Sequence, residues 1–334
     1  MKRMHIRLHF GRKWIISTLL ISVLSLIFLL SATLRHSTAS PWSDASFLHS
    51  TTTVSSGDFG AGDDMLGHLQ LPRFSYLIYG TTGDGRRLLR LLQAVYHPRN
   101  YYLLHPDLDA SEAERLELAM YVQFDRVMSK SGNVMVVGKV DLITYKGPTT
   151  VAFTLHAIAI LLKQVKNWDW FINLSASDYP LMSQDGSAWV VLTRPFLELC
   201  ARGWDNLPRT LLLYHANILL SANSYFHTVA CNHKDFQNTT VNHGLRYIKW
   251  DSPPRELPVT LTANDFDAMV QSGALFGHAI GRDDPVLDKI DRVLLRRGDM
   301  WFGIGPCVIC GDPDFVSPTL GSRRLEQLLV TLLF

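Results

Sequence analysis

The sequence predicts an α/β fold with a mostly parallel sheet, preceded by a single transmembrane helix near the N-terminus. From residue 74 onward, short apolar runs that end in glycine or polar residues alternate with segments whose apolar residues recur at helical spacing. Strands that alternate with helices favour a parallel sheet, because each helix carries the chain back across the sheet. Ahead of this region lies an apolar stretch of membrane-spanning length. The 334 residues, 47% hydrophobic and 19% charged, are enough for one globular domain with a sizeable core.

Residues 14–34 are expected to form a transmembrane signal anchor. They contain no ionisable side chain, and about 20 apolar residues suffice to cross the hydrocarbon core as a helix. Because Lys and Arg residues cluster before them, residues 1–13 are predicted to be a cytosolic tail and everything after Arg35 to be luminal. Cleavage as a signal peptide stays an alternative. Residues 35–72, rich in Ser, Thr, Gly and Asp, are expected to form a luminal stem, or else a disordered extension without a spacing role.

The predicted globular domain covers residues 73–334, and its elements follow in order. The expected strands are FSYLIYG at 74–80, NYYLLH at 100–105, NVMVVG at 133–138 and DWFINL at 169–174. The expected helices are RRLLRLLQAVY at 86–96, ASEAERLELAMYVQ at 110–123, in which Ser111 and Glu114 have capping-box spacing, and a third that begins at Pro148. Parallel sheets bind ligands beyond the carboxyl ends of their strands, so the loops at 80–85, 105–109 and 175–180 are expected to line a site.

Two of these loops carry patterns that suggest phosphate or metal binding, but each has a plainer interpretation. GTTGDG, with glycines at 80, 83 and 85, fits neither a dinucleotide loop nor a Walker loop, so a strand-to-helix turn is favoured over a phosphate cradle. The D-x-D string at 107–109 is of a kind that holds divalent metals. It follows only the second strand, so Asp109 is expected to help cap the next helix, and no metal site is expected.

The cysteines and the glycosylation sequons all lie in the part predicted to be luminal. Disulfides are permitted there, and the sequence leaves open the pairing of Cys200, Cys231, Cys307 and Cys310. The C-x-x-C pair at 307–310 has no companion pair, which favours a loop disulfide or a lone thiol over zinc. Asn238 heads a sequon in a polar loop and is predicted to be glycosylated, whereas the sequon at Asn173 ends a buried strand and is predicted to be unmodified. The net charge of +2 gives no whole-molecule case for a nucleic-acid partner.

A series of motifs along residues 73–320 resembles one enzyme family. The stretches are YLIYGTTGDG, AVYHPRNYYLLHPDLDA, TYKGPTTVAFTLHAIAILL, NLSASDYPL, GSAWVVLTRPF, GWDNLPRTLLLY, SYFHTVACN, TTVNHGLRYIKWDSPP and GRDDPVLDKID. They are similar to the core-2/I-branching β-1,6-N-acetylglucosaminyltransferase family, in particular to its plant β-glucuronosyltransferase-like branch, which acts on arabinogalactan glycans. The resemblance implies a Golgi type II membrane glycosyltransferase whose luminal domain has a GT-A-like (Rossmann-type) fold.

The resemblance also implies the chemistry. A carboxylate takes the proton of an acceptor hydroxyl while that oxygen attacks the anomeric carbon of a UDP-sugar, with inversion and in a single displacement. Basic side chains, in place of a metal cofactor, neutralise the leaving diphosphate. The implied donor is UDP-glucuronate or UDP-N-acetylglucosamine, and the implied acceptor is a β-galactan-type glycan on a glycoprotein.

By position, the resemblance implies two sets of site residues. The donor-binding residues are Asp107 and Tyr145 at the uridine, with Arg255 and His278 at the diphosphate. The acceptor-binding residues are Asp178, Trp189 and Trp250, the last as an aromatic platform. On the residues alone, plainer roles stay open: a helix cap for Asp107, core packing for Tyr145 and Trp250, and a solvated surface charge for Arg255.

The chain departs from the family at three places. Only residues 182–185 separate NLSASDYPL from GSAWVV, where relatives carry several dozen residues, so the sheet is expected to be truncated between Asp178 and Trp189. Asn223 stands where relatives carry the general-base Glu, and an amide cannot accept that proton; His227 is a weaker substitute. His278 and Ala279 replace an Arg and a Lys, which removes positive charge from the diphosphate site. The remaining candidates to supply that charge are Arg282, Arg323 and Arg324.

Two classes of function therefore stay open. The chain is either an active transferase or a catalytically impaired relative, such as a splice product, that acts at most as a glycan-binding or partner-binding module. A glycan hydrolase would need two carboxylates that flank the scissile bond, and nothing in the spacing of Asp178 and Asp251 supports that pair.

Overall fold

The computed structural model describes residues 72–144, 146–182, 192–241, 243, 245–297 and 320–333. Residues 68–334 form one compact unit. Several predicted features lie outside the described residues: the cytosolic tail, the anchor, the stem, Tyr145, Trp189, Cys307 and Cys310. In the part of the chain that the structure describes, no helix is long and apolar enough to span a membrane.

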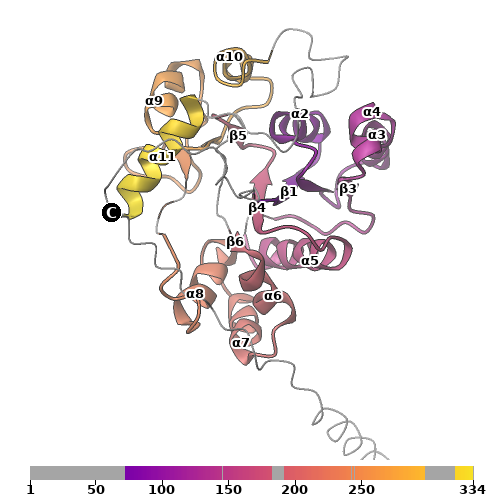
Figure 1. The fold of residues 1–334 in the computed structure, drawn as a ribbon, viewed down its shortest axis with the longest axis vertical. Helices are drawn as coiled ribbons and strands as arrows, with labels where there is room; N and C mark the ends of the chain where they lie inside the picture. The colour runs from indigo at the N-terminus through magenta and orange to yellow at the C-terminus, as the bar shows by residue number, and fades with distance from the viewer. Residues whose placement is uncertain are drawn as a thin grey trace, which may run out of the picture. The chain divides into compact units, whose positions relative to one another are not determined.

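A five-stranded sheet forms the centre of the unit, and it confirms the predicted α/β fold with a mostly parallel sheet (Figure 1). The strand order is β3-β2-β1-β4-β6. Its members are β1 (Phe74–Gly80), β2 (Tyr101–Pro106), β3 (Val134–Val136), β4 (Trp170–Ser175) and β6 (Leu192–Thr193). The first four run parallel, and β6 pairs antiparallel with β4. Because β1 lies between β2 and β4, the carboxyl ends of three predicted strands meet at one edge of the sheet.

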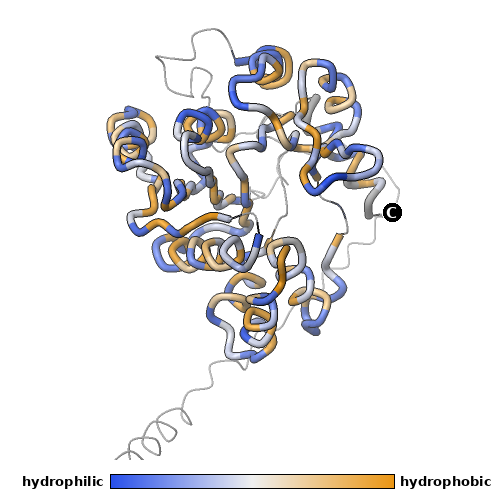
Figure 2. The backbone as a smooth tube through the Cα atoms, turned by 180° about the vertical axis from the view of Figure 1, so that it is seen from behind, coloured by the Kyte–Doolittle hydropathy of each residue, from blue (hydrophilic) through white to orange (hydrophobic). Residues whose placement is uncertain are grey.

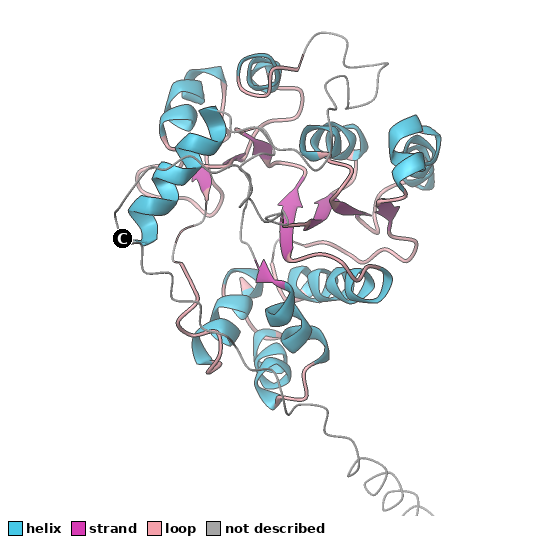
Figure 3. Cartoon of the chain, in the orientation of Figure 1, coloured by secondary structure: helices cyan, strands magenta, loops and turns pink. Residues whose placement is uncertain are grey.

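Helices cover both faces of this sheet (Figure 1). One face carries α2 (Gly85–Val95), α3 (Glu112–Phe124) and α4 (Arg126–Ser131). The other carries α5 (Thr149–Gln164), followed by α6 (Arg194–Arg202), α7 (Asn206–His215) and α8 (Tyr225–Asn232). The strands of the large sheet, magenta in Figure 3, lie between the two helical layers. All four predicted strands and all three predicted helices are therefore confirmed, and α4 is an additional helix that was not expected.

Alternation along the strands divides the apolar residues between two cores. On β1, Tyr76 and Ile78 enter the core beneath α2, and Leu77 enters the core beneath α5. All three side chains are fully buried. Figure 2 shows hydrophobic residues recurring along the strands and along the helices that flank them. A strand buried on both faces reads as a continuous apolar run, which is the pattern that marked these strands in the sequence.

A smaller sheet extends the fold beyond β4. Its strand order is β5-β8-β7, with β5 (Tyr179–Pro180), β7 (Arg246–Ile248) and β8 (Phe276–His278). Around it lie the short turn η3 (Ala263–Asp265) and the helices α9 (Phe266–Gln271), α10 (Pro285–Val293) and α11 (Leu320–Leu333). The short turn η2 (Ser221–Asn223) instead contacts α5 and α8. The chain therefore passes from the large sheet into the small one through the three residues between Ser175 and Tyr179.

An ionic network joins α2 to α10 across β5. Arg90 Nη2 lies 2.7 Å from Asp288 Oδ1 and 2.6 Å from Asp291 Oδ2. The Tyr179 hydroxyl donates a hydrogen bond of 2.7 Å to Asp291 Oδ1. Two of the motifs quoted from the sequence, NLSASDYPL and GRDDPVLDKID, thus include residues that hold the two sheets together.

Candidate functional site

The loops at the carboxyl ends of β1, β2, β4 and β8 are bonded to one another through the backbone. Asp107 N donates to Gly80 O at 2.9 Å, Ala176 N to Tyr79 O at 2.7 Å, and Ile280 N to Ser177 O at 3.0 Å. The three predicted loops at 80–85, 105–109 and 175–180 are therefore gathered at one edge, where a parallel sheet presents its ligand-binding crevice.

Asp178 lies at the centre of this edge and is buried among polar partners. Its Oδ2 accepts hydrogen bonds from the Ser175 amide at 2.7 Å, from Ser175 Oγ at 2.8 Å and from Arg246 Nη2 at 2.8 Å. Its Oδ1 lies 3.0 Å from His278 Nδ1. Burial alone would raise the pKa of Asp178, but the charges and hydrogen bonds of Arg246, His278 and Ser175 lower it below its usual value. The carboxylate is therefore ionised and fully engaged by the protein.

This cluster joins two residues from the predicted donor and acceptor sets. His278 and Asp178 were assigned to different ligands, and the structure places them in direct contact. The carboxylate of Asp178 is held inside the loop, while its assignment to the acceptor stays a prediction. Arg246, on β7, was not singled out from the sequence, because an arginine in a three-residue strand gives no local signal of a buried ion pair.

Tyr79 completes the cluster from the end of β1. Burial and, to a smaller extent, the nearby Asp178 carboxylate raise the pKa of its hydroxyl to about 12, against the opposite influence of Arg246. Burial also lowers the pKa of Arg246, against the opposite influence of Asp178 and Tyr79. An arginine remains protonated even so, and Tyr79 remains neutral. The buried charge at this point is thus one carboxylate and one guanidinium, with a histidine beside them.

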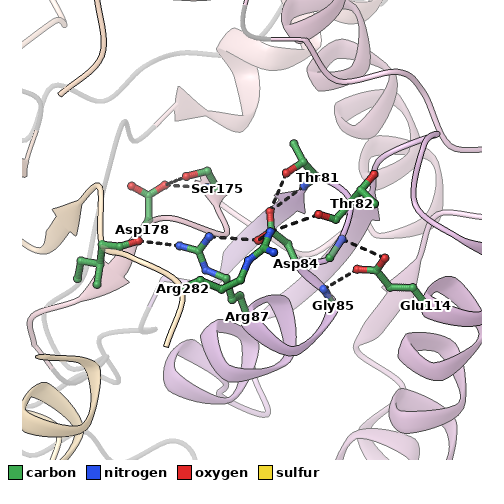
Figure 4. A network of polar contacts seen from close by, with 11 residues as sticks. Thr81, Thr82, Asp84, Gly85, Arg87, Glu114, Ser175, Asp178 and Arg282 are labelled. Atoms are coloured by element: carbon green, nitrogen blue, oxygen red, sulfur yellow. Dashed lines mark hydrogen bonds and ion pairs between the residues drawn. The ribbon is translucent and has the colours of Figure 1, made fainter. Parts of the chain in front are cut away.

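The GTTGDG loop is a strand-to-helix turn whose amides are already occupied. The Glu114 carboxylate of α3 accepts hydrogen bonds from Gly83 N at 3.1 Å and from Gly85 N at 2.8 Å (Figure 4). Amides at the start of a helix are the groups that a phosphate would bind. Because a carboxylate of the protein fills them, the structure supports the turn and argues against the phosphate cradle.

Two arginines form ion pairs with Asp84, which lies in the same loop. Arg87 Nη1 and Arg282 Nη2 lie 3.1 Å and 3.0 Å from Asp84 Oδ1 (Figure 4). Arg282 Nη2 also donates to Thr82 O at 3.3 Å. A Cβ atom on Gly83, where φ is +80°, would stand 3.0 Å from Arg282 Nη1, so glycine at this position leaves room for the guanidinium. Arg282, expected as a partial replacement at the diphosphate, thus lies at this edge but is paired with a carboxylate.

Asp107 is buried and binds backbone rather than solvent. Its Oδ1 accepts hydrogen bonds from Ile143 N at 3.2 Å and from Asp109 N at 3.4 Å. Ser111, not Asp109, caps α3, so the expected cap at Asp109 is wrong. Ser111 Oγ has the correct position because it can accept from the Glu114 amide. Within the described residues, no group of three or more His, Cys, Asp or Glu side chains is placed to hold a metal ion.

Lys146 and Gly147, which precede α5, contact two distant segments of the chain. Gly147 N donates to Leu219 O at 2.7 Å, and Ser221 Oγ donates to Gly147 O at 2.6 Å. Lys146 Nζ lies 2.5 Å from Glu256 Oε1. The turn η2, which ends at Asn223, and Glu256, which follows Arg255, are therefore both bonded to residues 146 and 147. The side chain of Asn223 is outside the described atoms.

The aromatic and basic residues of the predicted site differ in exposure. Trp250 is 49% exposed, which rules out core packing as its role. The Arg255 side chain is 81% exposed and pairs with Asp251 at 3.0 Å, so a solvated surface charge stays open. His227 is exposed on α8. Asn238 is exposed in a turn, and its glycosylation stays a prediction.

The two described cysteines are both free thiols. Cys200 lies on α6 and Cys231 lies on α8. Burial raises the pKa of the Cys200 thiol to about 12, whereas Cys231 is exposed. The two are therefore not paired with each other.

A family model described as "Branch: Core-2/I-Branching enzyme" matches residues 74–185 and 184–270, which together contain most of the loops above. This chain belongs to the Core-2/I-branching enzyme family. Beta-glucuronosyltransferase GlcAT14C from Arabidopsis thaliana is 47% identical over 327 residues, covering 79% of this chain and 83% of its own length. GlcAT14A from the same plant is 39% identical over 407 residues, covering 96% and 91%, and GlcAT14B is 40% identical over 337 residues, covering 78% of each. By homology this family member is a glycosyltransferase, an enzyme class that takes a nucleotide-sugar donor and a glycan acceptor.

The same comparisons bear on the expected truncation. The alignment with GlcAT14C runs over 327 residues but uses 79% of this 334-residue chain, roughly 264 residues, so about 60 of its positions have no residue here. The family model matches in two pieces that meet at residues 184–185. This junction coincides with the place where the sequence predicted a missing block, between Asp178 and Trp189.

Proposed function

We propose that this family member is a β-glucuronosyltransferase that transfers glucuronate from UDP-glucuronate to a β-galactan-type acceptor of arabinogalactan. The observation that carries the proposal is the 47% identity to GlcAT14C over most of both chains. GlcAT14A and GlcAT14B, which carry the same activity in their names, support the same donor. N-acetylglucosamine, the sugar of the wider family resemblance, is the competing donor.

The proposed reaction is an inverting, metal-independent displacement on a GT-A-like domain. The acceptor oxygen forms a bond to the anomeric carbon as the bond from that carbon to the diphosphate breaks, and UDP leaves. The proton of the acceptor hydroxyl passes to a general base. Asn223 occupies the position of that base and cannot accept the proton, so the reaction of the unaltered chain is expected to be slowed by about 10²–10⁴-fold.

The location is part of the same proposal. A cytosolic tail at residues 1–13, a signal anchor at 14–34 and a luminal stem at 35–72 would make the chain a single-pass type II protein of the Golgi membrane. Acceptor glycans on secreted glycoproteins would meet the enzyme in that compartment. The apolar stretch and the positive charge that precedes it support this proposal.

A second candidate is a catalytically impaired relative that binds glycans or a partner protein. Two observations favour it: Asn223 at the base position, and the roughly 60 aligned positions that have no residue in this chain. The described core has two sheets, with helices on both faces of the larger one. It is compatible with a folded protein that binds a glycan or a partner protein but does not catalyse sugar transfer.

The experiment compares the purified full-length chain with Asn223→Glu. Product and UDP release are followed from labelled UDP-glucuronate and UDP-N-acetylglucosamine on β-galactan oligosaccharides. Asn232→Glu, which adds the same charge at an exposed position of α8, is the matched control. We expect a folded, nearly silent parent, rescue by Asn223→Glu with UDP-glucuronate, and no rescue by Asn232→Glu.

The other outcomes separate the candidates. Fast turnover by the parent would refute the loss of the base. Silence of both proteins, with retained binding of the galactan, would favour the impaired binding module. Preference for UDP-N-acetylglucosamine would overturn the proposed donor.

A further inference from the structure

The outer side of α3 carries an exposed apolar stripe, whereas the outer side of a surface helix is ordinarily polar. Leu116 is 59% exposed, Met120 46% and Phe124 73%. Because they are spaced by four positions, these side chains form one row along the helix. Ala113, which is also exposed, extends the row toward the start of α3. These four residues are called the α3 stripe below. Leu118 packs into the core from the opposite side of the helix.

The α3 stripe and the candidate site lie on different sides of the same helix. α3 and α4 contact β3, which is the edge strand of the large sheet (Figure 1). Glu114, which points away from the stripe, accepts hydrogen bonds from the Gly83 and Gly85 amides of the site loop. Apolar side chains that gather in one exposed patch, unlike scattered ones, mark an interaction surface. A surface at the stripe is therefore separate from the contacts that α3 makes with the site.

Charges of opposite sign lie at the two ends of the α3 stripe. Glu112 and Glu117 are exposed in the first half of α3. Arg126 and Lys130 are exposed on α4, directly after the end of α3. The surface is thus acidic at one end, apolar in the middle and basic at the other end.

This order of charges is complementary to itself. A second copy could pack its own stripe antiparallel to the first, about a two-fold axis at Met120. The acidic end of each copy would then lie beside the basic end of the other, and Leu116 would lie opposite Phe124. Parallel packing would instead bring like charges together at both ends. Charge complementarity of this kind fixes the register and orientation of an interface.

A lipid surface fits the α3 stripe less well than a second copy does. Helices that lie in a membrane interface carry Lys and Arg along the polar side of their apolar face, where they attract anionic headgroups. Glu112 and Glu117 stand beside the first half of the stripe, and anionic headgroups would repel them. A partner with acidic and basic ends in the reverse order satisfies both halves of the surface.

We propose that the chain forms a homodimer in which the α3 stripes of two copies pack antiparallel across a two-fold axis at Met120. An apolar centre with a charged rim is the usual anatomy of a protein interface. A specific interface buries roughly 800 Å² on each partner, so the stripe is its centre and the polar residues around it on α3 and α4 are its rim. Phe124, the most exposed large side chain of the stripe, is the anchor.

The first test measures the oligomeric state of the full-length chain in detergent by sedimentation velocity. We expect dimers with a dissociation constant in the micromolar range or below. Phe124→Glu is expected to raise that constant about 30-fold or more, because it places a charge at the anchor. Leu213→Glu is the matched control, since Leu213 is 75% exposed on α7, and it is expected to leave the constant unchanged. Circular dichroism shows whether each variant is folded.

The second test exchanges the charges at the ends of the stripe. Glu112→Lys combined with Glu117→Lys makes both ends basic, and Arg126→Glu combined with Lys130→Glu makes both ends acidic. Each double variant alone is expected to be mostly monomeric, because like charges meet at both ends. A mixture of the two is expected to restore dimers that contain one copy of each. A loss of folding could not be repaired in this way.

The third test locates the two-fold axis by disulfide formation. Helices that pack with their axes about 8–10 Å apart bring the Cα atoms at the crossing point within range of a disulfide. Met120→Cys is therefore expected to link two copies under mild oxidation. Ala113→Cys, on the same side of α3, would lie about 20 Å from its counterpart and is expected not to link. Both variants are made together with Cys231→Ser, because Cys231 is an exposed thiol.

Four results would overturn the proposal. The first is a parent that stays monomeric at micromolar concentrations. The second is a dimer that Phe124→Glu and Leu213→Glu affect equally, since another surface would then hold it. The third is linkage by Ala113→Cys as efficient as linkage by Met120→Cys. The fourth is a monomeric parent that phosphatidylserine vesicles retain and from which Phe124→Glu is released, which would assign the stripe to lipid. The proposed sugar transfer is tested separately and does not depend on these outcomes.

Discussion

Breaking the buried ion pair between Arg246 and Asp178 is expected to destabilise the domain strongly. The Asp178 side chain is fully buried and that of Arg246 is 14% exposed, with 2.8 Å between Nη2 and Oδ2. Arg246→Leu leaves the carboxylate with Ser175 and His278 as partners. Removal of one partner of a buried pair costs about 3–5 kcal/mol of unfolding free energy. For a domain of this size, that loss lowers Tm by roughly 10 °C.

The assay is thermal unfolding of the full-length chain, followed by circular dichroism. Arg246→Leu, Asp178→Asn and the double variant form a thermodynamic cycle. The second substitution removes a charge that the first has left unpaired. The unfolding free energy of the double variant is therefore expected to fall by about 1–3 kcal/mol less than the sum of the two single losses. Arg255→Leu is the control, since this exposed pair with Asp251 contributes about 0–1 kcal/mol.

Two results would refute this reasoning. One is a change in Tm for Arg246→Leu no larger than that for Arg255→Leu. The other is strict additivity in the cycle, which would mean that the two side chains do not stabilise each other although they are in contact.

Four further predictions follow from individual side chains. Glu114→Ala is expected to lower the unfolding free energy by about 1–2 kcal/mol in urea, because two amides lose their acceptor. The lowered pKa of Asp178 contributes stability that is present above about pH 4 and is lost as pH falls further, so Asp178→Asn should flatten the decline of Tm below pH 4. Alkylation at pH 8 should modify Cys231 and spare Cys200, whose thiol pKa is raised to about 12 by burial, as peptide mass spectrometry can show. Asn238→Gln should remove a glycan when the chain is expressed in a secretory pathway, visible as a shift in gel mobility.

Each of these has a clear contrary result. An unchanged urea midpoint for Glu114→Ala would mean that water replaces the carboxylate as acceptor without any loss of unfolding free energy. A decline of Tm in acid that is identical in Asp178→Asn would assign it to other carboxyl groups. Equal alkylation of Cys200 and Cys231 in the folded chain would contradict the burial of α6. An unshifted Asn238→Gln band would leave that sequon unmodified.

Much of the large sheet could be predicted because its strands are buried on both faces. β1, β2 and β4 are strands of six or seven residues that are mostly apolar or aromatic, and the helices between them carry a one-sided apolar pattern. The small sheet could not be predicted, because β5, β7 and β8 have only two or three residues each. Strands of that length show no period, and their pairing depends on contacts from distant parts of the chain.

The position of the candidate site in the fold could be predicted from the sequence, but the contacts between its side chains could not. The loops were expected at the strand ends, and they lie there. Arg246 and His278 meet Asp178 across 68 and 100 residues, separations at which no local pattern exists. Glu114 shows the same limit on a smaller scale. Its spacing from Ser111 predicted a capping box, and its amide does bond to Ser111, but its carboxylate reaches the start of α2 instead.

The short passage from β4 to β5 has a consequence for how this domain tolerates change in length. By Pro180 the chain has entered both sheets, and the junction at 184–185 comes only afterwards. Segments gained or lost at such a junction leave the pairing of β4 with β1 and of β5 with β8 in place. Exon boundaries and indels are best accommodated where few pairings cross them. The stretch after β5 is therefore a position at which the chain can change in length without interrupting a strand of either sheet.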